Sequence, residues 1–276
     1  MQKKLLVLLL ALLISGLCTG CTSGILPGTD GPDSDPQPDS NPVITSRVVM
    51  MELFVNPACT RCAKIHPNIV KLRQEYGFNE LVILEEYGLD SYLYTGWGVY
   101  DVLNRFIEYR KYSNDNIGGY PDAYFNGLSQ TVHHSDGEGY YNYKAAIEKE
   151  LAKTARIVIT ATYSVIGQMV SINGNITNIS SDVLNNLVVE VMVYEDSVYS
   201  GFFAPYVDHV VRDIITYQES GGEELIASFT PGESHEFSLT SSYLSNVHNM
   251  SNIHVVVYVQ APDSSTKEIL QALYME

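Results

Sequence analysis

The chain has 276 residues, of which 45% are hydrophobic and 17% charged, so it can build packed cores and global disorder is excluded. Its 32 acidic residues outnumber 16 basic ones and give a formal net charge of −16. A surface of this sign repels nucleic acid and anionic lipid headgroups, which excludes nucleic acid as a partner.

Residues 1–20 are typical of a lipoprotein signal peptide. A basic start at Lys3 and Lys4 precedes residues 5–14, an apolar run too short to span a bilayer. Small residues then lead to Cys21 in a pattern that resembles a lipobox, with Cys18 where leucine is usual. We expect lipid on Cys21 and a chain that is exported and anchored to the cell envelope, facing the extracytoplasmic side. The alternative is an ordinary secretory signal peptide cut near the same place.

Residues 21–45 predict a flexible tether, because they are rich in Pro, Asp, Ser and Gly and lack apolar periodicity. Export also limits which cysteines remain as free thiols and what they can form. Cys18 leaves with the signal peptide and Cys21 carries lipid, so Cys59 and Cys62 are the free thiols in an oxidising compartment. They must form a disulfide, a cycling dithiol or part of a metal site.

Residues 46–154 predict an α/β domain with the order β-α-β-α-β-β-α. An apolar run at 48–54 indicates a buried parallel strand, and the helix after it opens with Cys59-Thr60-Arg61-Cys62. The remaining elements are a strand at 81–84, a helix at 99–112, a hairpin at 120–133 that turns at Asn126-Gly127, and a helix that contains Tyr143 and Leu151.

The strand, CxxC and helix arrangement predicts a redox site. Two thiols in one helical turn can close a disulfide, and the positive end of the helix favours a thiolate on Cys59. A disulfide across so small a loop would stabilise the fold little, so a structural role explains it poorly. A soft-metal site remains the alternative, with His66 as a third ligand beside Cys59 and Cys62. A structural zinc site would need a fourth ligand, and the sequence has no second CxxC.

Residues 155–276 predict an all-β, immunoglobulin-like sandwich. Alternating or continuous apolar residues mark several strands with turns between them and no helical period, at 157–163, 170–176, 186–194, 234–239 and 252–260.

The first domain resembles the thioredoxin superfamily. The resemblance is carried by the CxxC, by Pro67 five residues after it, and by Gly119-Tyr120-Pro121 before a strand that ends at Gly127. It implies a thioredoxin-like fold in which Pro121 is a cis proline that faces the disulfide and the bound peptide.

The same resemblance implies a buried acid six residues before the first cysteine, where this chain has Leu53. Glu52 is one position earlier and would need a one-residue bulge to reach the site. Buried beside the disulfide, Glu52 would have a raised pKa and could take a proton from Cys62, which makes it the candidate proton shuttle.

The order of a thioredoxin-like domain and a C-terminal sandwich is similar to the twenty-eight-kilodalton outer membrane protein family of surface lipoproteins. Strand patterns at 193–196, 206–212 and 255–260 carry this second resemblance. It implies a cell-surface location and a thioredoxin fold, and no established substrate.

The expected function is that of a membrane-anchored thiol–disulfide oxidoreductase in which Cys59 attacks and Cys62 resolves. It needs no cofactor, because electrons come from a partner dithiol. Its partners would be protein disulfide or dithiol substrates and a membrane electron donor or acceptor. The alternatives are a non-catalytic surface-binding module on a thioredoxin scaffold and a metal carrier that uses Cys59, Cys62 and His66.

Overall fold

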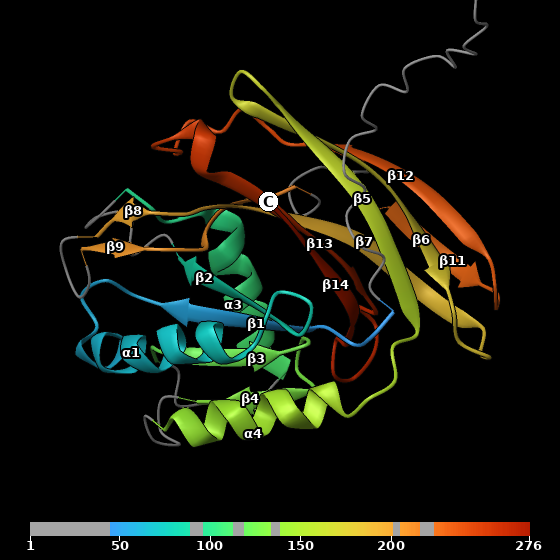
Figure 1. Ribbon diagram of the computed structural model, residues 1–276, viewed down its shortest axis with the longest axis horizontal. Coiled ribbons are helices and arrows are strands. Elements are labelled where there is room, and N and C mark those ends of the chain that lie inside the picture. Colours follow the sequence, from blue (N-terminus) through green and yellow to red (C-terminus); the bar gives the residue numbers. More distant parts are fainter. Residues whose placement is uncertain (1–44, 89–95, 113–118, 134–138, 201–204, 216–223) are drawn as a thin grey trace, which may run out of the picture. The chain divides into compact units, whose positions relative to one another are not determined.

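The computed structural model describes residues 45–88, 96–112, 119–133, 139–200, 205–215 and 224–276 (Figure 1). The predicted signal peptide, Cys21 and all but the last residue of the tether lie outside these ranges. In chain order the elements are β1 (Val49–Val55), α1 (Thr60–Glu75), β2 (Leu81–Tyr87), α3 (Tyr100–Tyr112), β3 (Asp122–Phe125), β4 (Gln130–Val132), α4 (Tyr140–Leu151), β5 (Ile157–Ile166), β6 (Met169–Asn178), β7 (Leu184–Glu195), β8 (Val198–Tyr199), β9 (Tyr206–Val207), β10 (Val210–Ile214), β11 (Glu224–Phe229), β12 (Ser234–Thr240), the 3-10 helix η2 (Met250–Asn252), β13 (Ile253–Gln260) and β14 (Ile269–Met275).

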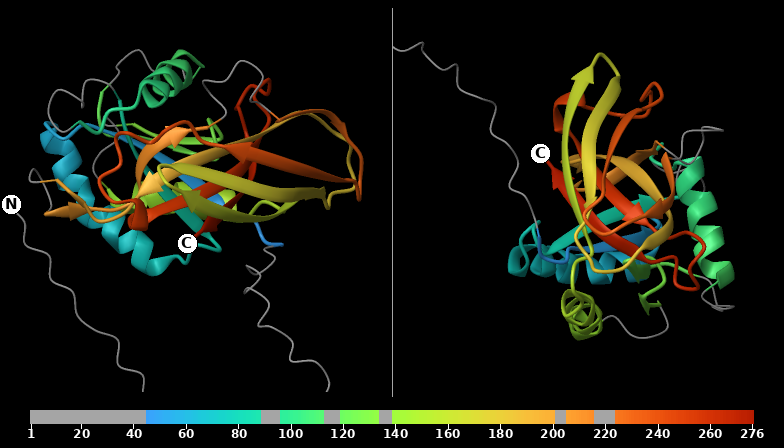
Figure 2. Two further views of the ribbon diagram at one scale, coloured as in Figure 1. Left: turned by 90° about the horizontal axis from the view of Figure 1, so that it is seen from above. Right: turned by 90° about the vertical axis from the view of Figure 1, so that its right-hand side faces the viewer.

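The predicted order β-α-β-α-β-β-α is confirmed for the first half of the chain. Strand β1 is buried along its whole length and lies between β2, to which it is parallel, and β3, to which it is antiparallel. Because side chains alternate along a strand, β1 contributes to two apolar cores. Met51, Leu53 and Val55 belong to the core under α1 and α4, whereas Met50 and Phe54 belong to the core under α3. The views in Figure 2 show α1 and α3 on opposite sides of the sheet.

Helix α1 begins directly after the turn that follows β1. Cys59 is its N-cap, with an extended backbone and a side chain that accepts a hydrogen bond from the N–H of Cys62. The buried stripe of the helix is Cys62, Ile65, Ile69 and Leu72, at the spacing of a single helical face. This buried stripe packs α1 against the sheet, and the first turn of α1 lies at the carboxyl end of β1.

One nine-stranded sheet joins the two predicted domains. Its path runs β14-β13-β7-β10-β2-β1-β3-β4, and β11 pairs with the free stretch of β7 (Figure 1). The join is the parallel pairing of β10 with β2, where Val210 lies opposite Glu85 and the N–H of Glu85 donates to the carbonyl of His209 at 2.9 Å. The sheet therefore crosses the predicted boundary at 154/155, and the described residues from 45 onward belong to one compact unit.

The second half is a two-layer β structure, as predicted. A three-stranded sheet of order β12-β6-β5 packs on the part of the large sheet formed by β7, β11, β13 and β14. Apolar residues from both layers share one core, including Ile159 and Ile172 from the small sheet and Val191 and Val257 from the large one. The α/β half and the sandwich half are both present, and the large sheet belongs to both.

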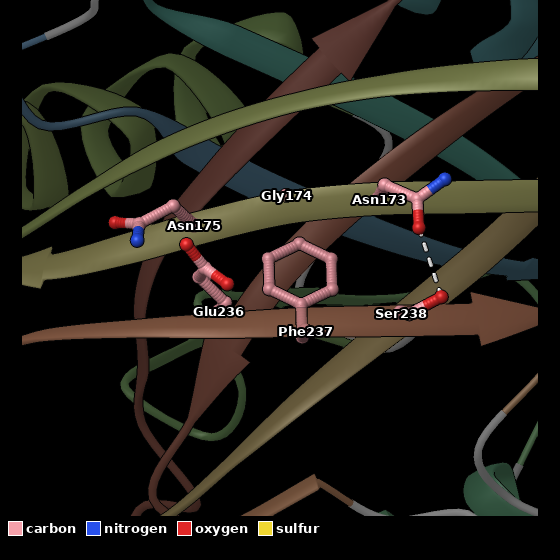
Figure 3. Close-up of a pocket in the computed structure, with 6 residues that line it drawn as sticks. All are labelled: Asn173, Gly174, Asn175, Glu236, Phe237 and Ser238. Carbon is pink, nitrogen blue, oxygen red and sulfur yellow. Dashed lines mark hydrogen bonds between the residues drawn. The ribbon is translucent and has the colours of Figure 1, made fainter.

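A shallow pocket on the small sheet is a product of strand packing (Figure 3). The ring of Phe237 on β12 lies beside Gly174 on β6, where a Cβ atom would come within 2.4 Å of the ring. Ser238 donates a hydrogen bond to Asn173 across the same strand pair at 2.8 Å. Gly174 thus leaves space for the aromatic ring, and the lining carries no cluster of reactive groups.

In the described ranges, no helix combines the length and the apolar character that crossing a membrane requires.

Candidate active site

Cys59 is held at the end of β1 by a short turn. The side chain of Asn56 accepts a hydrogen bond from the N–H of Ala58 at 2.9 Å, and its carbonyl accepts one from the N–H of Cys59 at 3.0 Å. The sulfur of Cys59 then accepts a hydrogen bond from the N–H of Cys62 at 3.1 Å. An N–H donor and the start of a helix both favour negative charge on this sulfur. Cys59 is partly exposed, so a substrate can reach it.

Cys62 lies one helical turn deeper and is 2% exposed. Burial raises the pKa of its thiol well above the ordinary value, and the hydrogen bond to Cys59 and the charge of Glu85 raise it further. Both thiols are free in this structure. The pair is therefore asymmetric, with one accessible sulfur at the helix tip and one buried, protonated sulfur behind it.

The loop before β3 completes the front of the site. The peptide bond between Tyr120 and Pro121 is cis, and the thiol of Cys59 donates a hydrogen bond to the carbonyl of Tyr120 at 3.3 Å. Pro121 therefore directly follows the residue whose carbonyl group contacts the accessible cysteine. Cys59, Cys62 and Pro121 are brought together from two distant segments of the chain.

Glu52 is not brought to the thiols. The register of β1 with β2 runs from Val49 to Val55 without a shift, so the bulge that Glu52 needs is absent from this described strand pair. Its side chain lies on the α3 face of the sheet, where Arg105 and Tyr109 bind its carboxylate, the latter at 2.8 Å. Cys62 belongs to the core on the opposite face. The structure thus gives Glu52 an ion-pair role and no path to the thiols.

Glu85 is the acid that does lie behind the thiols, and sequence reasoning missed it. It is directly opposite Leu53 in the pairing of β1 with β2 and is 2% exposed. Along β2 it shares a face with Ile83 and Tyr87, which belong to the core of Cys62. The alternation of strand residues 81–87 was the available signal, because it places Glu85 on the same face as Leu81 and Ile83.

His66 lines the same small cavity as Cys62, behind the active-site turn. In the parts of the chain that the structure describes, no group of three or more His, Cys, Asp or Glu side chains has the arrangement of a metal site. The set of Cys59, Cys62 and His66 is therefore not assembled as a ligand cluster in this structure.

In comparisons with known proteins, no family model matches this chain and no curated protein matches it. Solved structures do share its fold. HBP35 of Porphyromonas gingivalis is 13% identical with a TM-score of 0.65, over 83% of this chain and 74% of that one. Protein AGR_C_4864 from Agrobacterium tumefaciens is 17% identical with a TM-score of 0.54, over 83% of this chain and 94% of that one. At these identities the likeness concerns the fold alone.

A further solved structure matches part of this chain. A domain of the outer membrane lipoprotein Omp28 from Porphyromonas gingivalis is 20% identical, over 44% of this chain and 94% of that domain. Its TM-score is 0.30, too low to support an argument about the fold of this chain.

Proposed function

We propose that this protein is a thiol–disulfide oxidoreductase of the thioredoxin superfamily. The observation that carries the proposal is the placement of Cys59. Its sulfur caps a helix, accepts the N–H of Cys62 at 3.1 Å, and lies 3.3 Å from the carbonyl of Tyr120 beside Pro121. A nucleophilic thiol needs accessibility and a hydrogen-bond donor that favours its anion, and Cys59 is partly exposed and accepts the N–H of Cys62.

In the proposed reaction Cys59 attacks a substrate disulfide and forms a mixed disulfide, while the first substrate thiolate leaves. Cys62 then attacks the sulfur of Cys59, the second substrate thiolate leaves, and the Cys59–Cys62 disulfide remains. The substrate gains two electrons and the protein dithiol loses two. A partner dithiol at the membrane reduces the protein again, so no prosthetic group takes part.

We also propose that the protein works at the cell envelope as a lipoprotein related to the Omp28 proteins. The support is the lipobox-like sequence before Cys21 and the proline-rich tether that follows it. A tether of this composition would hold residues 46–276 away from the membrane and leave Cys59 open to extracytoplasmic partners.

Trapping of mixed disulfides tests the proposal. Cys62→Ser removes the resolving thiol with little change in volume, so complexes that dissolve on adding reductant should accumulate on Cys59 in the membrane fraction. Cys59→Ser should trap far fewer, because Cys62 is buried. Adding Cys21→Ser to the Cys62→Ser protein should move the complexes to the soluble fraction. If no complexes form in the Cys62→Ser protein, the chain is a binding module and not an oxidoreductase.

A further inference from the structure

The turn between β5 and β6 carries apolar side chains that the fold does not bury. Ile166, the last residue of β5, pairs with Met169, the first residue of β6, across a turn of Gly167 and Gln168. Ile166 is 66% exposed, and Met169 and the preceding Val165 are exposed as well. Adjacent apolar side chains that remain in water are a feature of surfaces that bind a partner or a lipid.

A second segment adds an aromatic side chain to this turn. Residues 241–244 are bound to the hairpin through the main chain, because the N–H of Leu244 donates to the carbonyl of Gln168 at 2.9 Å. Ser241 is held in the same way by the carbonyl of Val170, at 2.8 Å. Tyr243, which lies between these two contacts, is 67% exposed. The four exposed residues are called the apolar tip and are Val165, Ile166, Met169 and Tyr243.

The apolar tip lies in parts of the sequence that have no charged side chains. Residues 157–181 and 237–262 contain no Asp, Glu, Lys or Arg, although the whole chain has 32 acidic and 16 basic residues. Asp213 accepts a hydrogen bond from Ser242 at 3.3 Å, but this acid is buried. An uncharged apolar tip on an acidic protein is complementary to a neutral apolar partner and not to an ionic one.

We propose that the apolar tip inserts into the interface of a membrane with electrically neutral lipid headgroups, an inference that rests on the proposed location at the cell envelope. Aliphatic side chains such as Ile166 and Met169 would enter the boundary between headgroups and acyl chains. Tyr243 suits the headgroup level, because its ring is apolar and its hydroxyl is polar. The side chains are already exposed, so insertion requires no rearrangement of the fold.

The predicted lipid anchor can bring the tip to the membrane. The described chain begins near the start of β5, because Arg47 and Arg156 both pair with Glu268. Strand β5 has ten residues, which places the turn about 33 Å away at its other end (Figure 1). Residues 22–45 can span up to about 80 Å when extended, and a flexible chain of that length spans about 27 Å on average. The tether would therefore keep the tip at a high local concentration near the lipid.

Vesicle flotation tests the proposal. The probe is phosphatidylcholine vesicles at millimolar lipid, and the protein is the mature chain with Cys21→Ser, which carries no lipid. Four side chains give weak and reversible binding that washing removes, so we expect flotation only at high lipid concentration. Ile166→Ser combined with Met169→Ser should lower the partition coefficient by about 10-fold or more. Ile107→Ser is the matched control, because Ile107 on α3 is 54% exposed, and it should leave partition unchanged.

An added tryptophan gives a readout of the tip itself. Trp97 is the only tryptophan of the chain and is buried, so lipid should change its emission little. The emission of Ile166→Trp should shift to the blue with phosphatidylcholine vesicles and should be quenched when the acyl chains are brominated. Ile107→Trp is again the control and should show neither effect.

Two results would overturn the inference. One is a parent chain that does not float while Ile166→Trp is not quenched; the other is equal flotation of the parent and the double variant. Dimerisation of the parent that the double variant loses, without flotation of either, would make the tip a contact between copies of this chain and also overturn the lipid proposal. Membrane fractionation of Cys21→Ser cells tests the envelope location separately, so failure of flotation leaves that proposal in place.

Discussion

The two cysteines differ in chemistry because the first turn of α1 places them at different depths. Cys59 occupies the N-cap, where its sulfur meets the N–H of Cys62 and remains partly exposed. Cys62 faces the core beneath the helix and is 2% exposed. Thiolates and not thiols react with electrophiles, so burial and protonation both protect Cys62.

Brief alkylation should therefore distinguish the two residues. In the reduced protein at neutral pH, iodoacetamide should modify Cys59 many times faster than Cys62, because the pKa of Cys62 is raised by burial. Mass spectrometry of the peptide that contains both cysteines, after short labelling times, gives the ratio. Labelling in denaturant is the control, since there the two rates should become similar. Equal labelling in the folded protein would leave no basis for separate attacking and resolving thiols.

The contrast between Glu52 and Glu85 shows what a single sequence can and cannot predict about this site. Both cysteines and Pro121 were predictable, because local motifs mark them. The alternation of residues 81–87 puts Glu85 on the core face of its own strand, but it does not say which residue of β1 lies opposite, and a shift of one residue along a strand moves a side chain to the other face. Glu52 is adjacent to Leu53 in sequence, but Glu85 is adjacent to Leu53 in the sheet. Only the pairing of β1 with β2 decides between them.

At the scale of elements, the hairpin of β3 and β4 was predicted from its turn sequence. The contact of that turn with the second half of the chain was not predicted. Asn126 and Gly127 have φ of 50° and 72°, as the short hairpin turn requires. The turn is also buried against the segment before β14. The N–H of Leu128 donates to the carbonyl of Thr266 at 2.6 Å, and a Cβ atom on Gly127 would lie 2.0 Å from the carbonyl oxygen of Lys267. The hairpin therefore docks the first half on the second.

The effect of Gly127→Ala on the unfolding free energy should show how much this contact contributes beyond the backbone strain of a positive φ. The matched control is Gly167→Ala, because Gly167 has a φ of 62° and open space around its Cα. The control should lose about 1 kcal/mol of unfolding free energy through backbone strain alone. Gly127→Ala should lose about 3 kcal/mol or more, because the backbone of Lys267 must also move. Urea unfolding of both variants measures the difference, and equal losses would mean that the contact is not required.

At the scale of the whole molecule, the shared sheet makes the two halves one structure. The order of elements in residues 46–154 was predictable, since each element has its own apolar period. The pairing of β10 with β2 was not, because parallel strands far apart in sequence leave no local signal of their contact. The same pairing supplies the carbonyl groups that hold Arg73 and the main chain of Glu85.

A buried polar cluster crosses the same junction on the α3 face. Arg105 of α3 binds Glu52 of β1 and, at 3.2 Å, Glu190 of β7, so it links both halves of the chain. Burial and the charge of Glu52 raise the pKa of the nearby Glu86 well above its ordinary value, so Glu86 is neutral there. Arg105 is then the cation that compensates two buried carboxylates, and its loss would leave both uncompensated.

Arg105→Ala should consequently destabilise the whole chain and not one half of it. We expect a loss of about 3–5 kcal/mol in unfolding free energy, the usual effect of removing one partner from a buried ion pair. The exposed Arg61→Ala is the control and should change stability by less than about 0.5 kcal/mol. Fluorescence of Trp97, the only tryptophan and a core residue of the first half, and far-UV circular dichroism of the sheets should report one coincident urea transition in both variants. Two separate transitions would show that the halves fold independently. An Arg105→Ala protein as stable as the control would show that the buried cluster does not join them.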